Sequence, residues 1–380
     1  MRQSIMQCHI RPGKVTEMKT KKILKIIAII LAVILLLFAI VCAIWHDAAK
    51  AVFYNLTATS LGSVETDDWS GGQVYENVQY SDVSENDYVN IYVPDGIDNP
   101  PLIVVVHGGG FITDDNKNRP AQRVYRYFRD HGFACASVNY RLAQEAAYPA
   151  ALEDVKACIR YLRANADKYG YNADSITITG ESAGGYLASA VALSSDDQFN
   201  DLEFIGESDL YPDVDGEYDA APDVEYTKIS AKVDTLIDFY GATYFREADE
   251  MWDDLHIPGV VLNIANSWIS GDVLQGYEDV HSYWLRKNAS ELTDEEYRDI
   301  KMTGFIEDNL TEDSDLKVYI SHGDCDITVP YTVSQLFYDE LTTKLPADQV
   351  VLNIVKNAGH AGDLIYTDEE LEKISEFILE

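Results

Sequence analysis

One short segment has the composition of a nucleophile turn. Residues 180–185 read Gly-Glu-Ser-Ala-Gly-Gly, directly after a β-branched run and directly before an apolar helical pattern. A serine at such a strand-to-helix turn is held in a strained backbone conformation with its hydroxyl exposed. Gly180 and Gly184 remove side chains that would clash across the bend. The segment predicts Ser182 as a nucleophile for acyl transfer, and this context disfavours a serine that merely caps a helix.

A second segment, His107-Gly108-Gly109-Gly110-Phe111, follows the apolar run Leu-Ile-Val-Val-Val. Consecutive glycines let the backbone approach a ligand closely and turn its N–H groups toward it. The tetrahedral intermediates of acyl transfer need such donors. We therefore expect the N–H groups of Gly108, Gly109 and Ala183 to form an oxyanion hole. His107 is expected to support the loop by hydrogen bonding and not to act in catalysis.

A serine nucleophile needs a base and an orienting acid, which follow it along the chain in this kind of site. The histidines after the serine are His256, His281, His322 and His360. His360 lies in a loop between a strand pattern and the last helix pattern, so it is the predicted base. Asp324 and Asp326 both lie in the preceding loop, and position alone does not separate them, while Asp363 is a third option. Glu181 is expected to be oriented by local packing.

Metal and cofactor signals are weak. Asp213, Asp215, Glu217 and Asp219 alternate along the chain, which permits a calcium loop, but they lack the full spacing of an EF-hand. The cysteines of the body (135, 158 and 325) fit neither a zinc site nor a disulfide framework. We expect no metal and no organic cofactor.

The elements that would position these residues alternate between strands and helices. Strands are predicted at 73–80, 88–93, 102–106, 133–138, 175–179, 236–240, 316–320 and 350–355. Helices are predicted at 149–165, 183–193, 330–345 and 368–379. This alternation favours a mostly parallel sheet with helices on both faces. The acidic stretch 195–230 and the long stretch 242–315 interrupt the pattern, and the second is expected to be an inserted cap of helices that shapes the substrate pocket.

The N-terminal residues predict a membrane anchor. Residues 1–22 are basic, residues 23–45 are apolar except for Lys25, and residues 46–70 resemble a linker to a domain at 71–380. About 20 apolar residues suffice to cross a bilayer, and this run is longer than that of a typical cleaved signal. Basic residues before the span place the N-terminus in the cytoplasm and the domain outside it. Secretion after signal cleavage is the alternative.

The charge of the chain argues against nucleic acid as a partner. The net charge is −35, although residues 1–50 contain eight Lys and Arg against two acidic residues. A body this acidic repels polyanions and suits a well-solvated exported domain. The sequence makes no prediction about the oligomeric state.

Five segments together resemble the acetyl-esterase and lipase branch of the α/β-hydrolases, the hormone-sensitive-lipase-like group. They are HGGGF, SVNYRLAQEAAYPAALEDVKACIRYLRANADKYG, GESAGG, SHGDCDITVP and NAGHAGD. The resemblance covers roughly residues 75–240 and 315–380. It implies an α/β-hydrolase fold, with Asp326 as the acid, His360 as the base, and Gly108 and Gly109 in the oxyanion hole.

The resemblance also implies an activity. The expected reaction is hydrolysis of short-chain acyl or acetyl esters, on small molecules or on carbohydrate, through an acyl-enzyme. A serine peptidase of the same fold is the main alternative, although the HGGG loop favours esters. A binding protein on an inactivated hydrolase scaffold is disfavoured, because every catalytic part is present.

Overall fold

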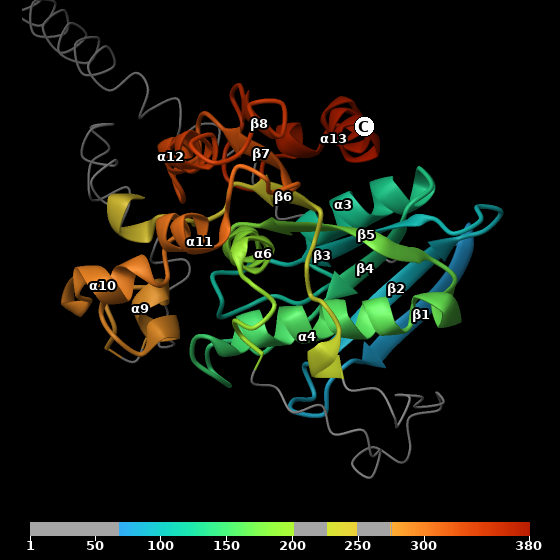
Figure 1. The fold of residues 1–380 in the computed structure, drawn as a ribbon, viewed down its shortest axis with the longest axis horizontal. Coiled ribbons are helices and arrows are strands. Elements are labelled where there is room, and N and C mark those ends of the chain that lie inside the picture. Colours follow the sequence, from blue (N-terminus) through green and yellow to red (C-terminus); the bar gives the residue numbers. More distant parts are fainter. Residues whose placement is uncertain (1–67, 201–225, 249–273, 275) are drawn as a thin grey trace, which may run out of the picture. The chain divides into compact units, whose positions relative to one another are not determined.

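The computed structural model describes residues 68–200, 226–248, 274 and 276–380 (Figure 1). Its centre is an eight-stranded sheet with the order β1-β2-β4-β3-β5-β6-β7-β8. The strands are β1 (Gly72–Gln79), β2 (Tyr88–Pro94), β3 (Pro101–Val106), β4 (Ala134–Val138), β5 (Asn172–Glu181), β6 (Thr235–Phe239), β7 (Lys317–Gly323) and β8 (Val350–Val355). The first two are antiparallel to their neighbours, and every pairing from β4 to β8 is parallel. The predicted mostly parallel sheet is confirmed.

The helices lie mainly between the strands. They are α3 (Arg119–Asp130), α4 (Ala150–Ala164), α5 (Ala166–Tyr169), α6 (Ala183–Leu193), α9 (Val280–Leu285), α10 (Asp294–Arg298), α11 (Met302–Asn309), α12 (Tyr331–Leu341) and α13 (Asp368–Leu379). Short 3-10 turns are η1 (Tyr226–Lys228), η3 (Ala289–Glu291) and η4 (Asp363–Tyr366). The sequence predicted four of the longer helices and missed α3.

Alternating side chains of the central strands enter two cores, one on each face of the sheet. In β3, Val104 and Val106 pack with α4, α6 and α12, whereas Ile103 and Val105 pack with α3 and α13. A strand that is apolar on both faces is what a sheet covered by helices on both sides requires. The expectation of helices on both faces is therefore confirmed.

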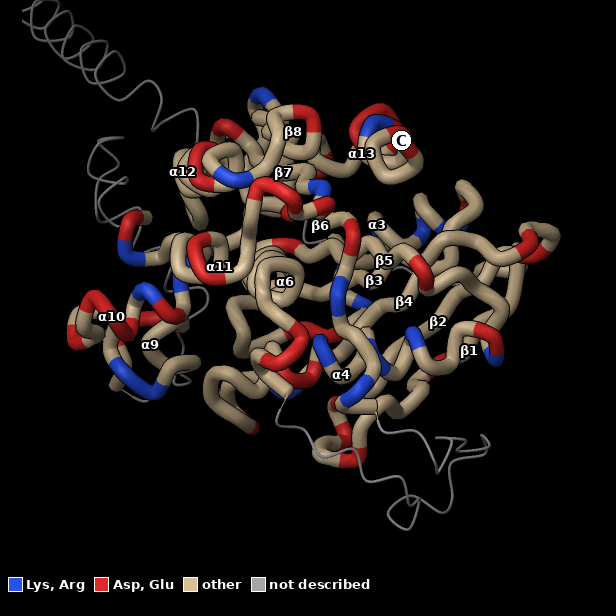
Figure 2. The backbone as a smooth tube through the Cα atoms, viewed as in Figure 1, with Lys and Arg blue, Asp and Glu red and all other residues tan. Residues whose placement is uncertain are grey.

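The described part of the predicted cap contains short helices. Between β6 and β7, which are hydrogen-bonded neighbours in the sheet, the chain forms α9, η3, α10 and α11. Residues 249–273 of this insertion are outside the described residues, as are residues 201–225 with the possible calcium ligands. Figure 2 shows acidic residues on α10, α11, α12 and α13.

The predicted membrane span at 23–45, the basic segment before it and nearly all of the linker also lie outside the described residues. Within residues 68–200, 226–248, 274 and 276–380, no helix combines the length and the apolar character needed to cross a bilayer.

Candidate active site

The strand-turn-helix geometry expected around Ser182 is present. β5 ends at the residue before it and α6 begins at the residue after it, and Ser182 itself has φ 55° and ψ −118°. A positive φ is strained for a residue with a side chain, and such strain concentrates at functional sites. A Cβ on Gly180 would lie 2.1 Å from the Gly184 carbonyl oxygen, so the bend requires glycine. The first turn of α6 therefore packs against the end of β5, and the serine lies at the bend between them.

The structure brings Ser182, His360 and Asp326 together from three separate loops. His360 Nε2 lies 3.1 Å from Ser182 Oγ, and His360 Nδ1 lies 2.7 Å from Asp326 Oδ2. With Nδ1–H donating to the carboxylate, Nε2 is left to accept the hydroxyl proton of the serine. The ring of Tyr240 packs edge-on against His360, with centroids 4.7 Å apart, and fixes its orientation.

Geometry separates the three carboxylates that position left open. Asp326 contacts His360, whereas Asp324 Oδ1 accepts a hydrogen bond from the backbone N–H of Asn357 at 2.5 Å. Asp363 pairs with Arg119 and Arg123 on α3, with N···O distances of 3.0 and 3.1 Å. Only Asp326 therefore has the position of an orienting acid.

Asp326 is held by donors on both oxygens. Its Oδ1 accepts the backbone N–H groups of Thr328 and Val329 at 2.7 and 2.9 Å. Its Oδ2 accepts from His360 and also lies 3.2 Å from Nε2 of His322, whose Nδ1 contacts Ser334 Oγ at 2.7 Å. The sequence analysis named His322 among the candidate bases and selected His360. In the structure His322 contacts the acid instead, and its Nε2 also lies 3.0 Å from the Val329 carbonyl oxygen.

The electrostatics of the pair favour charge separation. Burial raises the pKa of Asp326, but the charge of His360 and hydrogen bonds from both histidines outweigh it and hold the pKa below its ordinary value. Burial lowers the pKa of His360, but Asp326 outweighs that effect and raises it. The pair therefore stabilises an imidazolium, which is the form that a general base acquires when it takes a proton.

The glycine-rich loop corrects one prediction. The N–H of Gly108 donates to Glu181 Oε1 at 2.6 Å, and Gly108 is buried. An N–H held by a buried carboxylate is not directed at a substrate, so Gly108 does not fit the oxyanion role predicted for it. Gly109 and Gly110 are partly exposed, have φ of +93° and +61°, and donate to no acceptor among the described residues. Ala183 is the first residue of α6, so its N–H has no partner within the helix.

His107 lies under this loop. Its Nδ1 is 2.9 Å from the carbonyl oxygen of Gly108, and its ring stacks on Tyr140 with centroids 4.3 Å apart. The Tyr140 hydroxyl donates to the His107 carbonyl at 2.8 Å. Burial lowers the pKa of His107 to about 4, so the ring is neutral at neutral pH. These contacts are those of a residue that supports the loop.

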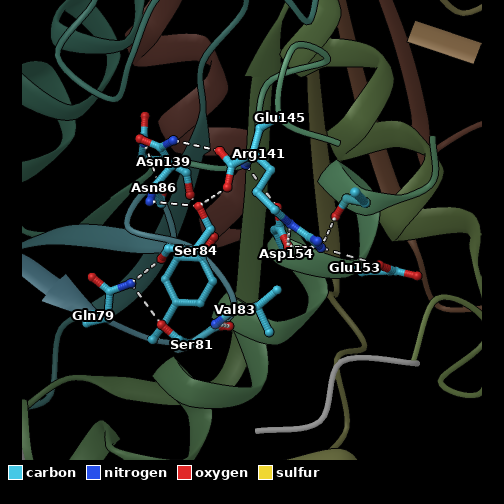
Figure 3. Close-up of polar contacts among 12 residues, drawn as sticks. Gln79, Ser81, Val83, Ser84, Asn86, Asn139, Arg141, Glu145, Glu153 and Asp154 are labelled. Carbon is cyan, nitrogen blue, oxygen red and sulfur yellow. Dashed lines mark hydrogen bonds and ion pairs between the residues drawn. The ribbon is translucent and has the colours of Figure 1, made fainter. Parts of the chain in front are cut away.

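The long motif at residues 137–170 has a structural basis (Figure 3). Arg141 Nη2 and Nε contact the two oxygens of Asp154 at 2.6 and 2.9 Å, and the Asp154 side chain is fully buried. Beside this pair, Glu145 accepts hydrogen bonds from Ser84 and Asn86, which precede β2. This network fixes the loop that starts with Tyr140, and through Tyr140 it supports the glycine-rich loop.

An aromatic contact that the sequence did not predict joins the cap to the glycine-rich loop. Phe111 stacks on Trp284 of α9, with centroids 4.1 Å apart and rings nearly parallel. His281, also in α9, lies between Phe111 and Phe245, and its ring stacks on Phe245 at 4.6 Å. In the sequence, the position of Phe111 directly after the three glycines is the feature from which such a contact could have been predicted. The described part of the cap thus packs directly on the loop beside the serine.

No group of ligands within the described residues has the arrangement of a metal site. The described site brings together a serine, a histidine and an aspartate, and the N–H groups of Gly109 and Gly110 donate to no acceptor among the described residues.

Comparison with known proteins gives three kinds of similarity. The model of the BD-FAE family matches residues 89–341. Esterase LipQ of Mycobacterium tuberculosis is 38% identical over 97 residues, which cover 26% of this chain and 23% of that protein. An acetyl esterase of Salmonella schwarzengrund is 36% identical over 94 residues, which cover 24% of this chain and 28% of that protein. The matches thus span about a quarter of these relatives.

The fold has close counterparts among solved structures. A truncated form of a carbohydrate esterase from gut microbiota superimposes with a TM-score of 0.61 at 21% identity, over 82% of this chain and 97% of that one. At this identity the similarity shows a shared fold, and it agrees with the predicted α/β-hydrolase architecture.

Proposed function

Since more than half of its residues match the family model, the chain belongs to the BD-FAE family, and we propose that it is a serine carboxylic-ester hydrolase. The observation on which this rests is the continuous contact from Asp326 through His360 to Ser182, with distances of 2.7 and 3.1 Å. The esterase names of the curated relatives support the same reaction class.

The reaction has two halves. Ser182 Oγ attacks the ester carbonyl carbon while His360 Nε2 takes its proton, and Asp326 stabilises the resulting imidazolium. The tetrahedral intermediate collapses, the alkoxy group leaves with the proton from His360, and an acyl-enzyme remains. Water then attacks the acyl carbon, again giving its proton to His360, and the acid is released as the serine regains its proton. One ester and one water thus become one acid and one alcohol.

The oxyanion is assigned to the N–H groups of Gly109, Gly110 and Ala183. This assignment is supported because these N–H groups donate to no acceptor among the described residues. Ala183 directly follows Ser182, and the two glycines directly follow Gly108, which contacts Glu181. Preorganised backbone donors are among the largest contributors to acyl-transfer catalysis. Gly110 takes the place that the sequence prediction gave to Gly108.

The proposed substrates are esters of short acyl groups, acetyl above all, on small molecules or carbohydrate. The printed names of an acetyl esterase and a carbohydrate esterase among the similar proteins support this choice. The aromatic packing of α9 on Phe111 is consistent with a cap that limits space beside the serine.

The test is hydrolysis of p-nitrophenyl esters from acetate to decanoate, and acetate release from acetylated oligosaccharides, by the full chain in detergent. Wild type is expected to prefer the shortest esters, and Ser182→Ala to lose activity by several orders of magnitude while remaining folded. Retained activity in Ser182→Ala would contradict the assignment. Cleavage of peptide substrates without ester hydrolysis would favour the peptidase alternative.

We also propose that residues 23–45 anchor the enzyme in a membrane, with the hydrolase domain outside the cytoplasm. The apolar run and the basic residues before it support this placement. The chain should stay in the membrane fraction after alkaline carbonate extraction, and added protease should reach the domain from the outer side. Release by carbonate, or protection from external protease, would contradict the proposal.

A further inference from the structure

Glu181 occupies an unusual place between the nucleophile and the glycine-rich loop. It is the last residue of β5, it directly precedes Ser182, and only 5% of its surface is exposed. Its Oε1 accepts two hydrogen bonds, from the N–H of Gly108 and from Asn118 Nδ2, both at 2.6 Å. Leaving a buried carboxylate without such donors is costly, so these contacts fix both the side chain and its partners.

The two donors lie near opposite ends of one segment. Gly108 begins the glycine-rich loop, and Asn118 ends it by capping α3, where its Oδ1 accepts the N–H of Ala121 at 2.9 Å. A Cβ on Gly108 would lie 2.4 Å from Glu181 Oε2, so the backbone and the carboxylate are already in contact. A single carboxylate therefore ties both ends of the segment that contains Gly109 and Gly110 to the nucleophile turn.

Glu181 also acts on the base through its charge. The charge of Glu181 is one of the causes that raise the pKa of His360, after that of Asp326. The other groups that interact electrostatically with Glu181 are Asp114, Tyr140, Tyr240 and Tyr366. The three tyrosines are neutral at neutral pH, because burial raises the pKa of each. Burial raises the pKa of Glu181 itself to about 7, although hydrogen bonds from Asn118 and Gly108 oppose this.

We propose that Glu181 is a positioning residue for the proposed ester hydrolysis, and that its two hydrogen bonds hold the glycine-rich loop in register with Ser182. The inference rests on the proposed function. It differs from the sequence interpretation, in which Glu181 is only oriented by packing. A purely structural role would affect unfolding alone, whereas this role also affects the binding of an oxyanion at the site.

Two variants of the full chain separate these effects. Glu181→Ala removes both hydrogen bonds, and Glu181→Gln keeps a carbonyl acceptor but removes the charge. The matched control is Glu376→Gln, which removes the charge of an exposed glutamate on α13. For each protein we would measure the Ki of a methyl trifluoromethyl ketone, which forms a tetrahedral oxyanion on the serine, and the KM for p-nitrophenyl acetate.

Glu181→Ala is expected to weaken the ketone roughly 10²-fold, the size of effect that a displacement of about 1 Å produces, while KM changes much less. Glu181→Gln keeps a neutral carbonyl acceptor and is expected to weaken the ketone less, roughly 10-fold, because a carboxylate accepts stronger hydrogen bonds than an amide. Glu376→Gln should match wild type in both measurements. If Glu181→Ala does not fold, the ketone Ki of Glu181→Gln decides.

A ketone Ki unchanged in folded Glu181→Ala, or unchanged in folded Glu181→Gln, would overturn the proposal. In that case hydrolysis by wild type, lost in Ser182→Ala, would leave the proposed function standing. Absence of ester hydrolysis by wild type would overturn both, so the two failures are distinguishable.

Discussion

Replacing Asp326 with asparagine tests the choice of acid most directly. An asparagine fits the same space and its carbonyl oxygen can still accept the N–H groups of Thr328 and Val329. Its amide nitrogen then faces His360 Nδ1, where the carboxylate oxygen lies 2.7 Å away in the wild-type site. Because an NH₂ group donates, Nδ1 must become the acceptor and the ring proton moves to Nε2. His360 then has no lone pair for the Ser182 hydroxyl.

The expected loss is set by that change of tautomer. An aspartate-to-asparagine change in a comparable triad lowers kcat by about 10⁴-fold, which corresponds to about 5 kcal/mol of transition-state stabilisation. The assay is kcat/KM for p-nitrophenyl acetate with the full chain in detergent, and circular dichroism establishes that the variant is folded.

The matched control is Asp324→Asn, two residues away. Asp324 Oδ1 accepts hydrogen bonds from the Asn357 N–H and the Cys325 thiol, whereas the carboxylate hydrogen-bonded to His360 Nδ1 is that of Asp326. We expect activity within a few-fold of wild type and a stability loss of about 1 kcal/mol from a weakened hydrogen bond. A loss of less than tenfold in Asp326→Asn, or a large loss in Asp324→Asn, would refute the assignment of the acid.

Three further predictions concern pH and stability. Activity should fall as the pH decreases through the pKa of His360, with a midpoint above the ordinary pKa of a histidine because Asp326 raises it, and a midpoint below that ordinary pKa would contradict the pair. Burial raises the pKa of Asp238 to about 7, so the folded state binds more protons than the unfolded state and this group makes stability fall as the pH rises from about 4 to about 7. Asp238→Asn should flatten that slope in urea unfolding at pH 5 and pH 8, and an unchanged slope would contradict the assignment. Arg141→Ala leaves Asp154 buried without its partner and should lower the free energy of unfolding by about 3–5 kcal/mol. A negligible change in urea unfolding would contradict this, because it is the result expected of a solvated pair.

Apolar periodicity was sufficient to predict the sheet. β3 is a continuous apolar run, and β6, β7 and β8 are mostly apolar, which is the composition expected of strands in a sheet covered on both faces. The start of β5 was placed three residues too late, because Asn172, Ala173 and Asp174 are not β-forming residues and pairing with the residues around Pro101 overrides their propensity.

The missed helix α3 shows a limit of reading composition before spacing. Residues 119–130 contain four arginines and look polar. The buried side chains of this segment nevertheless have helical spacing, at Ala121, Val124, Tyr125 and Phe128. Asn118, followed by a proline at position 120, is a strong signal for the start of a helix. The helix was therefore predictable, and its N-cap is one of the two donors to Glu181.

The three glycines of the loop show what spacing cannot decide. Gly108, Gly109 and Gly110 are equivalent as residue types, and each permits close approach of the backbone to a ligand. Which N–H faces a substrate depends on which glycine is pressed against the neighbouring strand, and that is a property of the packed sheet. Glu181 lies beside the loop only because β3 and β5 are paired in parallel, so that both segments leave the same edge of the sheet. The parallel pairing of β3 and β5 thus has two consequences. It places the glycine-rich loop beside the nucleophile turn, and it brings the N–H of Gly108 to the Glu181 carboxylate, where it is no longer available to a substrate.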